Sequence, residues 1–149
     1  MKNNTAIVSR AVTHCGLALQ YASEEMKNNV TIVRSAVQNH GLALGYASEE
    51  MKNDLEIVLS AVTKNGRALQ YITSEEIKNN EAIVQAAVGQ DGRALEWASE
   101  EIENNEAFVQ LAYMQNRHRE VAESIPKPKP RKRRHPLPYS HTIRNGFSG

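Results

Sequence analysis

The first fifty residues contain one stretch of sequence twice, and this duplication decides the fold. Residues 1–25 read MKNNTAIVSRAVTHCGLALQYASEE, and residues 26–50 read MKNNVTIVRSAVQNHGLALGYASEE. The motif returns with one extra residue at 51–76, again at 77–101, and in a partial copy at 102–125 that loses the pattern from Arg117 onward. A constant period of this length is typical of structural repeats that stack on one another.

Each copy predicts two short helices joined by a turn. An Asn or Asp stands where the first helix should begin, and its side-chain oxygen can accept a hydrogen bond from an unpaired backbone N–H. These predicted caps are Asn4, Asn29, Asp54, Asn80 and Asn105. A glycine should then end the helix in a left-handed conformation. These glycines are Gly16, Gly41, Gly66 and Gly92. The second helix should present Ala18, Leu19, Ala22 and Met26 on one face.

Helices this short are marginal alone, because forming the first turn is costly. Residues 1–125 are therefore predicted to fold as one all-α array, a short α-solenoid of ~25-residue helix-turn-helix repeats stabilised by stacking. From Pro126 the composition changes, and five prolines in the last 24 residues oppose helix formation. Residues 126–149 are predicted to be a disordered basic tail.

Two recurring positions have both a structural and a functional interpretation. An aromatic residue stands at one position of each full copy: Tyr21, Tyr46, Tyr71 and Trp97. It could form an exposed ladder, but packing at the edge of the core on the next repeat is favoured. Glutamate pairs occupy 24/25, 49/50, 75/76 and 100/101, and should form an acidic ridge. Lys27, Lys52 and Lys78 lie three residues after the first member of three pairs and give weak compensation.

The repeated pattern, from the cap through I-V-x-x-A-V, G-x-A-L and A-S-E-E to the next M-K, resembles the tandem repeats of domain-of-unknown-function family 4116. The resemblance covers Met1 to about Asn116, and four copies stand in register. It implies a helical repeat fold in which two copies make one family unit, and an interaction role. The family has no assigned catalytic activity, so the resemblance implies no catalytic residues.

The residues predict no enzyme, cofactor or metal site. The chain has no glycine-rich phosphate loop, no H-E-x-x-H and no C-x-x-C motif, and its five histidines lack metal-ligand spacing. The one candidate nucleophile is Cys15, whose counterparts are His40, Asn65, Asp91 and Asn116. Because stacked helices lie ~8–10 Å apart, a Cys15–His40 pair in hydrogen-bonding contact is not expected. Short polar residues that finish a helix are the preferred interpretation of this position.

Solenoids bind partners through positions that vary between repeats, although exposed positions also drift neutrally. The variable positions that we select as candidate protein-binding residues are Arg10, Arg34, Leu17, Leu42, Arg67 and Arg93. The first copy is as apolar as an interior one, so its outer face should expose Ile7, Val8 and Leu19. We expect this face to be covered by a second molecule, as in a homodimer, or by further repeats of a longer array.

The net charge of +1 conceals two unlike parts. Residues 1–125 contain 11 Lys+Arg and 17 Asp+Glu, for a charge of −6, whereas the tail carries +7. The tail cluster Lys129, Arg131, Lys132, Arg133 and Arg134 favours nuclear import or nucleic-acid binding as the alternative function. The structural interpretation is a solvated tail that balances the acidic ridge. No leader peptide or membrane span is recognisable, and one cysteine suits a reducing compartment, so a cytoplasmic or nuclear location is expected.

Overall fold

The computed structural model describes the backbone of residues 4–123 and the side chains of residues 4–117. Every regular element in this part of the chain is helical, which confirms the predicted all-α repeat fold. In chain order the elements are α1 (Thr5–His14), η1 (Gly16–Tyr21), α2 (Glu24–Lys27), α3 (Val30–Asn39), η2 (Gly41–Tyr46), α4 (Glu49–Lys52), α5 (Leu55–Lys64), η3 (Gly66–Tyr71), α6 (Glu75–Lys78), α7 (Glu81–Gln90), η4 (Gly92–Trp97), α8 (Glu100–Glu103) and α9 (Glu106–Glu123). The tail at 126–149 lies outside the described residues.

Each full structural repeat contains three helices rather than the predicted two. A long α-helix is followed by a 3-10 helix and then by a short α-helix, and this unit recurs over 4–28, 29–53, 54–79 and 80–104. The predicted second helix is interrupted because Ala22 and Ser23 adopt extended backbone between η1 and α2. The Ser23 side chain accepts a hydrogen bond from the Met26 N–H, and two glutamates follow in the first turn. The S-E-E motif therefore starts a new helix, since a hydroxyl cap and early acidic residues both favour a helix N-terminus.

The predicted caps of the long helices are confirmed. The Asn4 Oδ1 atom accepts from the Ile7 N–H at 3.1 Å, and the Asp54 carboxylate accepts from the N–H of Ile57 at 3.0 Å. Asn29 and Asn80 make the same contact three residues ahead, and Asn105 accepts from the N–H of Ala107. These bonds satisfy backbone donors that have no partner within the helix. They also place every long helix in the same register within its repeat.

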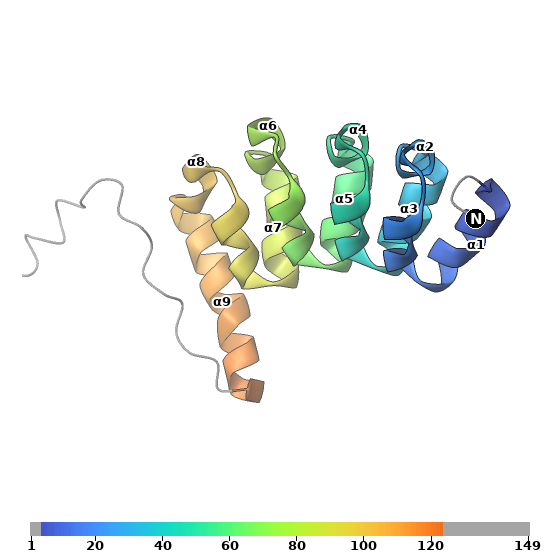
Figure 1. Cartoon of the computed structure of the whole chain (residues 1–149). Coiled ribbons are helices and arrows are strands. Elements are labelled where there is room, and N and C mark those ends of the chain that lie inside the picture. Colours follow the sequence, from blue (N-terminus) through green and yellow to red (C-terminus); the bar gives the residue numbers. More distant parts are fainter. Residues whose placement is uncertain (1–3, 124–149) are drawn as a thin grey trace, which may run out of the picture.

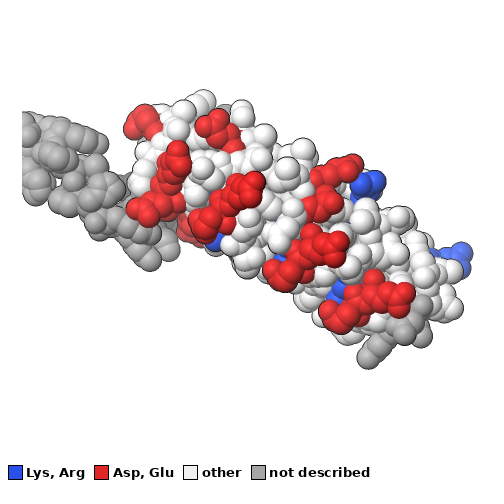
Figure 2. All heavy atoms as spheres, turned by 90° about the horizontal axis from the view of Figure 1, so that it is seen from above, with Lys and Arg blue, Asp and Glu red and all other residues white. Residues whose placement is uncertain are grey.

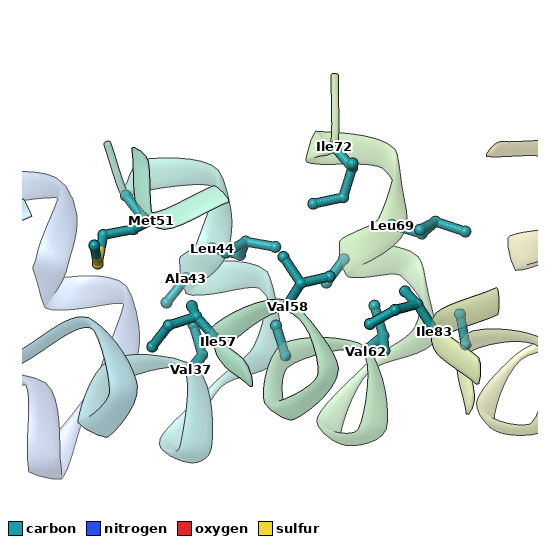
Figure 3. Close-up of a cluster of buried hydrophobic side chains, with 14 of the residues drawn as sticks. Val37, Ala43, Leu44, Met51, Ile57, Val58, Val62, Leu69, Ile72 and Ile83 are labelled. Carbon is teal, nitrogen blue, oxygen red and sulfur yellow. The ribbon is translucent and has the colours of Figure 1, made fainter. Parts of the chain in front are cut away.

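The long helices stand side by side in one row, and the 3-10 helices form a second row packed against them (Figure 1). The short helices α2, α4, α6 and α8 lie along one edge of the array. A single apolar core runs between the two rows without interruption. Figure 3 shows its centre, where Val58 of α5 lies between Leu44 of η2 and Leu69 of η3. All three side chains are fully buried. Each repeat therefore completes the core of its neighbours, and the fold depends on stacking.

The glycines that recur in the motif have a different role from the predicted one. None of Gly16, Gly41, Gly66 and Gly92 adopts a left-handed backbone; the long helix ends instead at an extended residue such as Cys15. A Cβ at Gly41 would lie 2.5 Å from the carbonyl oxygen of Ala61 in the next repeat, and one at Gly92 equally close to that of Ala112. Glycine is needed because neighbouring repeats approach closely there. The repeat spacing thus depends on a missing side chain.

Candidate interaction surfaces

Three apolar side chains are exposed on the outside of α3 and α5. Val30 begins α3, Leu55 begins α5, and Leu59 follows Leu55 by one helical turn. Their exposed fractions are 41%, 52% and 42%. The two helices pack against each other, so equivalent positions on them are neighbours. We call the surface formed by these three residues, with Arg34 and Glu56, the α3–α5 surface.

The apolar character of this surface is confined to the middle of the array. The counterparts of Val30 and Leu55 are Thr5, Glu81 and Glu106, and the counterparts of Leu59 include Ser9, Gln85 and Gln110. The fold therefore accepts polar residues at both positions. The Arg34 guanidinium bridges the same two helices by an ion pair with Glu56 at 3.0 Å. The sequence analysis selected Arg34 but missed Val30 and Leu55, which a comparison of the first residue of each long helix would have found.

The candidate residues Leu17, Leu42, Arg67 and Arg93 stand at one position of the 3-10 row. Leu17 and Leu42 are half-buried and pack against the core, so only part of each side chain is available to a partner. Arg67 and Arg93 are exposed. Arg93 forms an ion pair of 3.2 Å with the buried Asp91. This position therefore changes from an apolar core margin to a cationic surface along the array, and Arg34 lies apart from it on the other row.

The end of the array at α1 is exposed only in part. Ile7 is 48% exposed, but Val8 and Leu19 are buried, which corrects the expectation that all three face outward. Val8 and Leu19 belong to the faces of α1 and η1 that complete the core with the second repeat, where long helices and 3-10 helices of neighbouring repeats pack together. The candidate residue Arg10 is exposed on α1, and its backbone carbonyl oxygen lies 2.9 Å from His14 Nδ1.

The aromatic position lies at the edge of the core, and at Tyr71 the packing runs opposite to the predicted direction. A Cβ at Gly45 would lie 2.9 Å from Cε1 of Tyr71, so this ring packs over the preceding repeat and not the next one. Tyr71 and Trp97 are half-buried, whereas Tyr46 and Tyr21 are exposed. Tyr21 is the most exposed of the four, at 62% against 40% for Tyr46.

The glutamate pairs form a line of acidic side chains over the short helices (Figure 2). The predicted partners are in place, with Lys52 Nζ 3.0 Å from Glu49 Oε1 and similar pairs at Glu24–Lys27 and Glu75–Lys78. The hydrogen bond and charge of Lys52, assisted by a hydrogen bond from Thr73, hold the pKa of Glu49 below its usual range. Because the glutamate of each pair is largely exposed to solvent, each pair contributes little to stability.

Hydrogen bonds between short helices account for the asparagine that directly follows the lysine at the end of α2 and of α6. Asn28 at the end of α2 donates to Glu50 of α4 at 3.1 Å and accepts from Ser48, whose N–H donates to the Lys27 carbonyl oxygen. The same set links α6 to α8: Asn79 donates to Glu101 at 3.1 Å and accepts from Ser99 at 2.6 Å, and the Ser99 N–H bonds the Lys78 carbonyl oxygen. One glutamate of a pair therefore has a structural partner in the preceding repeat.

The link between α4 and α6 is different, because copy three carries the extra residue. Thr73 donates to Glu49 at 3.3 Å, and among the described residues the Ser74 N–H has no acceptor corresponding to those of Ser48 and Ser99. We call this place, between residues 53 and 54, the central junction. The α3–α5 surface lies across it, and so does the Arg34–Glu56 ion pair.

The family model described as domain of unknown function (DUF4116) matches residues 6–52, 29–77 and 54–103. The chain belongs to the DUF4116 family. Each matched segment spans two structural repeats, as the resemblance implied. Comparison with curated proteins and comparison with solved structures gave no match. The two DUF4116 segments 6–52 and 54–103 meet at the central junction.

The repeat position of the candidate nucleophile Cys15 lies directly before each 3-10 helix of the DUF4116 repeats. Asn65 and Asp91 end the preceding long helices as predicted, since their backbone N–H groups donate to the carbonyl oxygens of Ala61 and Ala87. Their side chains also accept a hydrogen bond from a backbone N–H two residues ahead, so they cap the following 3-10 helix as well. Cys15 is exposed, and His40 holds a buried Nδ1 without a hydrogen-bond partner. Within residues 4–117, no three His, Cys, Asp or Glu side chains are grouped to hold a metal ion.

The tail residues Lys129, Arg131, Lys132, Arg133 and Arg134 lie outside the described residues of this DUF4116 chain, so their roles stay predictions. In the part that is described, no helix has the length and apolar character needed to cross a membrane.

Proposed function

We propose that this DUF4116 array is a non-enzymatic protein-protein interaction module whose partner binds the α3–α5 surface. The observation that carries the proposal is the exposure of Val30, Leu55 and Leu59 on two adjacent helices. Contiguous exposed apolar side chains cost solubility, and in soluble proteins they mark interaction sites. The other repeats show that the fold does not require apolar residues there.

The surface also has the composition of a binding site. Apolar side chains at its centre offer area that a partner can bury, and the Arg34–Glu56 pair beside them offers charged groups for orientation. Arg34 is 40% exposed in its side chain, so the guanidinium is accessible at the margin of the surface. Arg67 and Arg93, on the 3-10 row, would be contacted only by a partner that also reaches that row.

The experiment is affinity capture with the immobilised full chain, followed by mass spectrometry. Three variants are compared with the original chain: Leu55→Glu with Leu59→Glu, the fourfold replacement of Arg131, Lys132, Arg133 and Arg134 by alanine, and Ile7→Glu as a control for adding one charge at an exposed apolar site. We expect a defined protein that is captured by the original chain, the tail variant and the Ile7 control. Its binding should fall at least about tenfold with the α5 double variant, as for a central contact.

The alternative function assigns binding to the tail, with the repeats as a scaffold, and rests on the +7 charge of residues 126–149 beside an acidic body. Nucleic acid or import factors would then be captured, would be lost with the fourfold tail variant, and would dissociate steeply with salt. If every captured molecule behaves in this way and none depends on Leu55 and Leu59, the interaction proposal is wrong. A nuclear location would follow from the import role, and a cytoplasmic one is compatible with the interaction role.

A further inference from the structure

The end of the array at α1 presents a surface that every later repeat buries. Ile7 is 48% exposed, whereas its counterparts Ile32, Ile57 and Ile83 are exposed by 1%, 0% and 3%. The counterparts are covered by the preceding repeat, because α3 packs on α1 and α5 packs on α3. The difference therefore comes from position in the array and not from residue type. Among the described residues, nothing takes the place of a preceding repeat at α1.

The small residues beside Ile7 show the same difference. Ala11 on α1 and Ala18 on η1 are half-buried, but their counterparts in the next three repeats have no exposed surface. These counterparts are Ala36, Ala61 and Ala87 on the long helices, and Ala43, Ala68 and Ala94 on the 3-10 helices. We call the surface of Ile7, Ala11 and Ala18 the α1 end face, and include Tyr21 at its margin, since its counterpart Tyr46 is less exposed at 40% against 62%. It continues, in register, the interface that holds the array together.

The opposite end of the same chain does not fit this face as an interior repeat would. In α9, Tyr113 is 48% exposed at the position where Val12, Val37, Val62 and Val88 are fully buried. Arg117 replaces the motif glycine, and a side chain at that position would collide with the helix of the next repeat, as the contacts at Gly41 and Gly92 show. Head-to-tail stacking of two copies in the interior geometry is therefore excluded.

We propose that the chain forms a two-fold symmetric homodimer in which the α1 end faces of two copies cover each other. A two-fold interface uses the same surface on both subunits, so this surface must be self-complementary. The α1 end face has both parts of such a contact: the projecting Ile7, and the low surface of Ala11 and Ala18 that can receive it. The proposal goes beyond the proposed function, because it concerns the α1 end face and not the α3–α5 surface.

The charges around the face add no attraction between two copies, so the apolar contact must hold them together. Helix α1 contains no acidic residue, and Arg10 occupies the position of the half-buried Ser35, Ser60 and Ala86. Half-buried counterparts place Arg10 at the margin of the face, where solvent screens its repulsion from the second Arg10. An apolar contact with like charges at its margin should hold or strengthen as salt is added. Association of the basic tail with a neighbour's acidic ridge would instead weaken.

The test is sedimentation velocity on the full chain from about 1 to about 200 µM, a range that reveals a micromolar dimer. It is run at low salt and at about 0.5 M NaCl, where exposed charges are strongly screened. Ile7→Glu and Tyr21→Glu are the interface variants, and Leu59→Glu on α5 is the matched control. All three replace an exposed residue, and circular dichroism verifies that each remains helical.

We expect the original chain and Leu59→Glu to reach a mass of two chains at both salt concentrations. Ile7→Glu and Tyr21→Glu should remain single chains, or dimerise at least about tenfold more weakly. A single chain at every concentration, a dimer unaffected by both interface variants, association that disappears in high salt, or species larger than two chains would each overturn the proposal. Loss of the captured partner with Leu55→Glu and Leu59→Glu, but not with Ile7→Glu, concerns the α3–α5 surface alone, so the two proposals fail separately.

Discussion

The backbone N–H of Gly16 donates a hydrogen bond of 2.7 Å to the Oδ1 atom of Asn39, in the next repeat. The Nδ2 atom of the same side chain donates to the Thr13 carbonyl oxygen at 2.9 Å. Asn39 thus satisfies a donor and an acceptor at the place where α1 passes into η1. Its counterparts are His14, Lys64, Gln90 and Gln115, and in the described part of the chain no corresponding bond is made to Gly41, Gly66 or Gly92.

We expect Asn39→Ala to lower the free energy of unfolding by roughly 1–2 kcal/mol, because the partly buried Gly16 N–H would lose its partner. Gln90→Ala, at the equivalent exposed position of the fourth repeat, should change it by less than about 0.5 kcal/mol. Urea denaturation followed by circular dichroism measures both. Equal effects of the two substitutions would show that the Asn39 bridge contributes nothing beyond helix propensity.

Gly41→Ala and Gly89→Ala should have effects of opposite sign on stability. A Cβ at Gly41 meets the Ala61 carbonyl oxygen at 2.5 Å and the Asn65 nitrogen at 2.9 Å, both of them backbone atoms. The repeats must separate to accommodate it, and such overpacking costs about 1–3 kcal/mol. Gly89 lies within α7 with nothing within 4 Å of the added atom. Alanine there should stabilise by about 0.5–1 kcal/mol through helix propensity. A Gly41→Ala chain as stable as the original would contradict the close approach.

The Ser74 amide should exchange with solvent at least about tenfold faster than the Ser48 amide. Ser48 N–H donates to the Lys27 carbonyl oxygen at 3.0 Å, whereas the Ser74 N–H has no such acceptor in the described part of the chain. Both residues are half-buried, so the comparison is not dominated by exposure. Hydrogen exchange by NMR gives the rates. The Lys52 and Lys78 amides, which donate to Ser48 and Ser74 carbonyl oxygens, serve as the matched pair and should exchange at similar rates.

Glu49 should titrate below its usual range, and Lys52→Met should return its pKa toward the ordinary value of 4.5, because the largest cause of the shift is Lys52. A carboxyl group with a lowered pKa stabilises the folded state above its ordinary pKa, and this contribution is lost as the pH falls through the folded-state pKa. Because the group is exposed, the measurement is an NMR titration of the carboxyl carbon rather than a melting curve. A shift that survives Lys52→Met would assign it to another group.

Recurrence in the sequence was enough to predict the fold class, the register and the helix caps, since an Asn or Asp stands three residues before I-V in four copies and before F-V in the fifth. The split of the predicted second helix was missed because the apolar spacing of Leu19, Ala22 and Met26 also fits one continuous helix. Only the Ser23 cap distinguishes the two arrangements. The role of Gly41 depends on the Ala61 carbonyl oxygen of another repeat, and no local pattern encodes that distance.

The candidate site was predicted less well, for a related reason. Variation between copies identified Arg34, but variability alone does not distinguish a solvent-facing position from the margin of the core. Leu17 and Leu42 vary with Arg67 and Arg93, yet they are half-buried because they pack against the core. Exposure requires knowing what each neighbouring repeat covers, and this information becomes available only when the stacking is known.

The central junction lies between the second and the third repeat. On each side of it, an Asn–Ser–Glu set of hydrogen bonds joins two short helices, α2 to α4 on one side and α6 to α8 on the other. At the central junction, the extra residue in copy three leaves the Thr73–Glu49 hydrogen bond in place of that set. Val30 and Arg34 belong to one half, and Leu55 and Leu59 to the other. A molecule that contacts all four residues therefore joins the two DUF4116 segments at the boundary where, among the described residues, the short helices lack the Asn–Ser–Glu set.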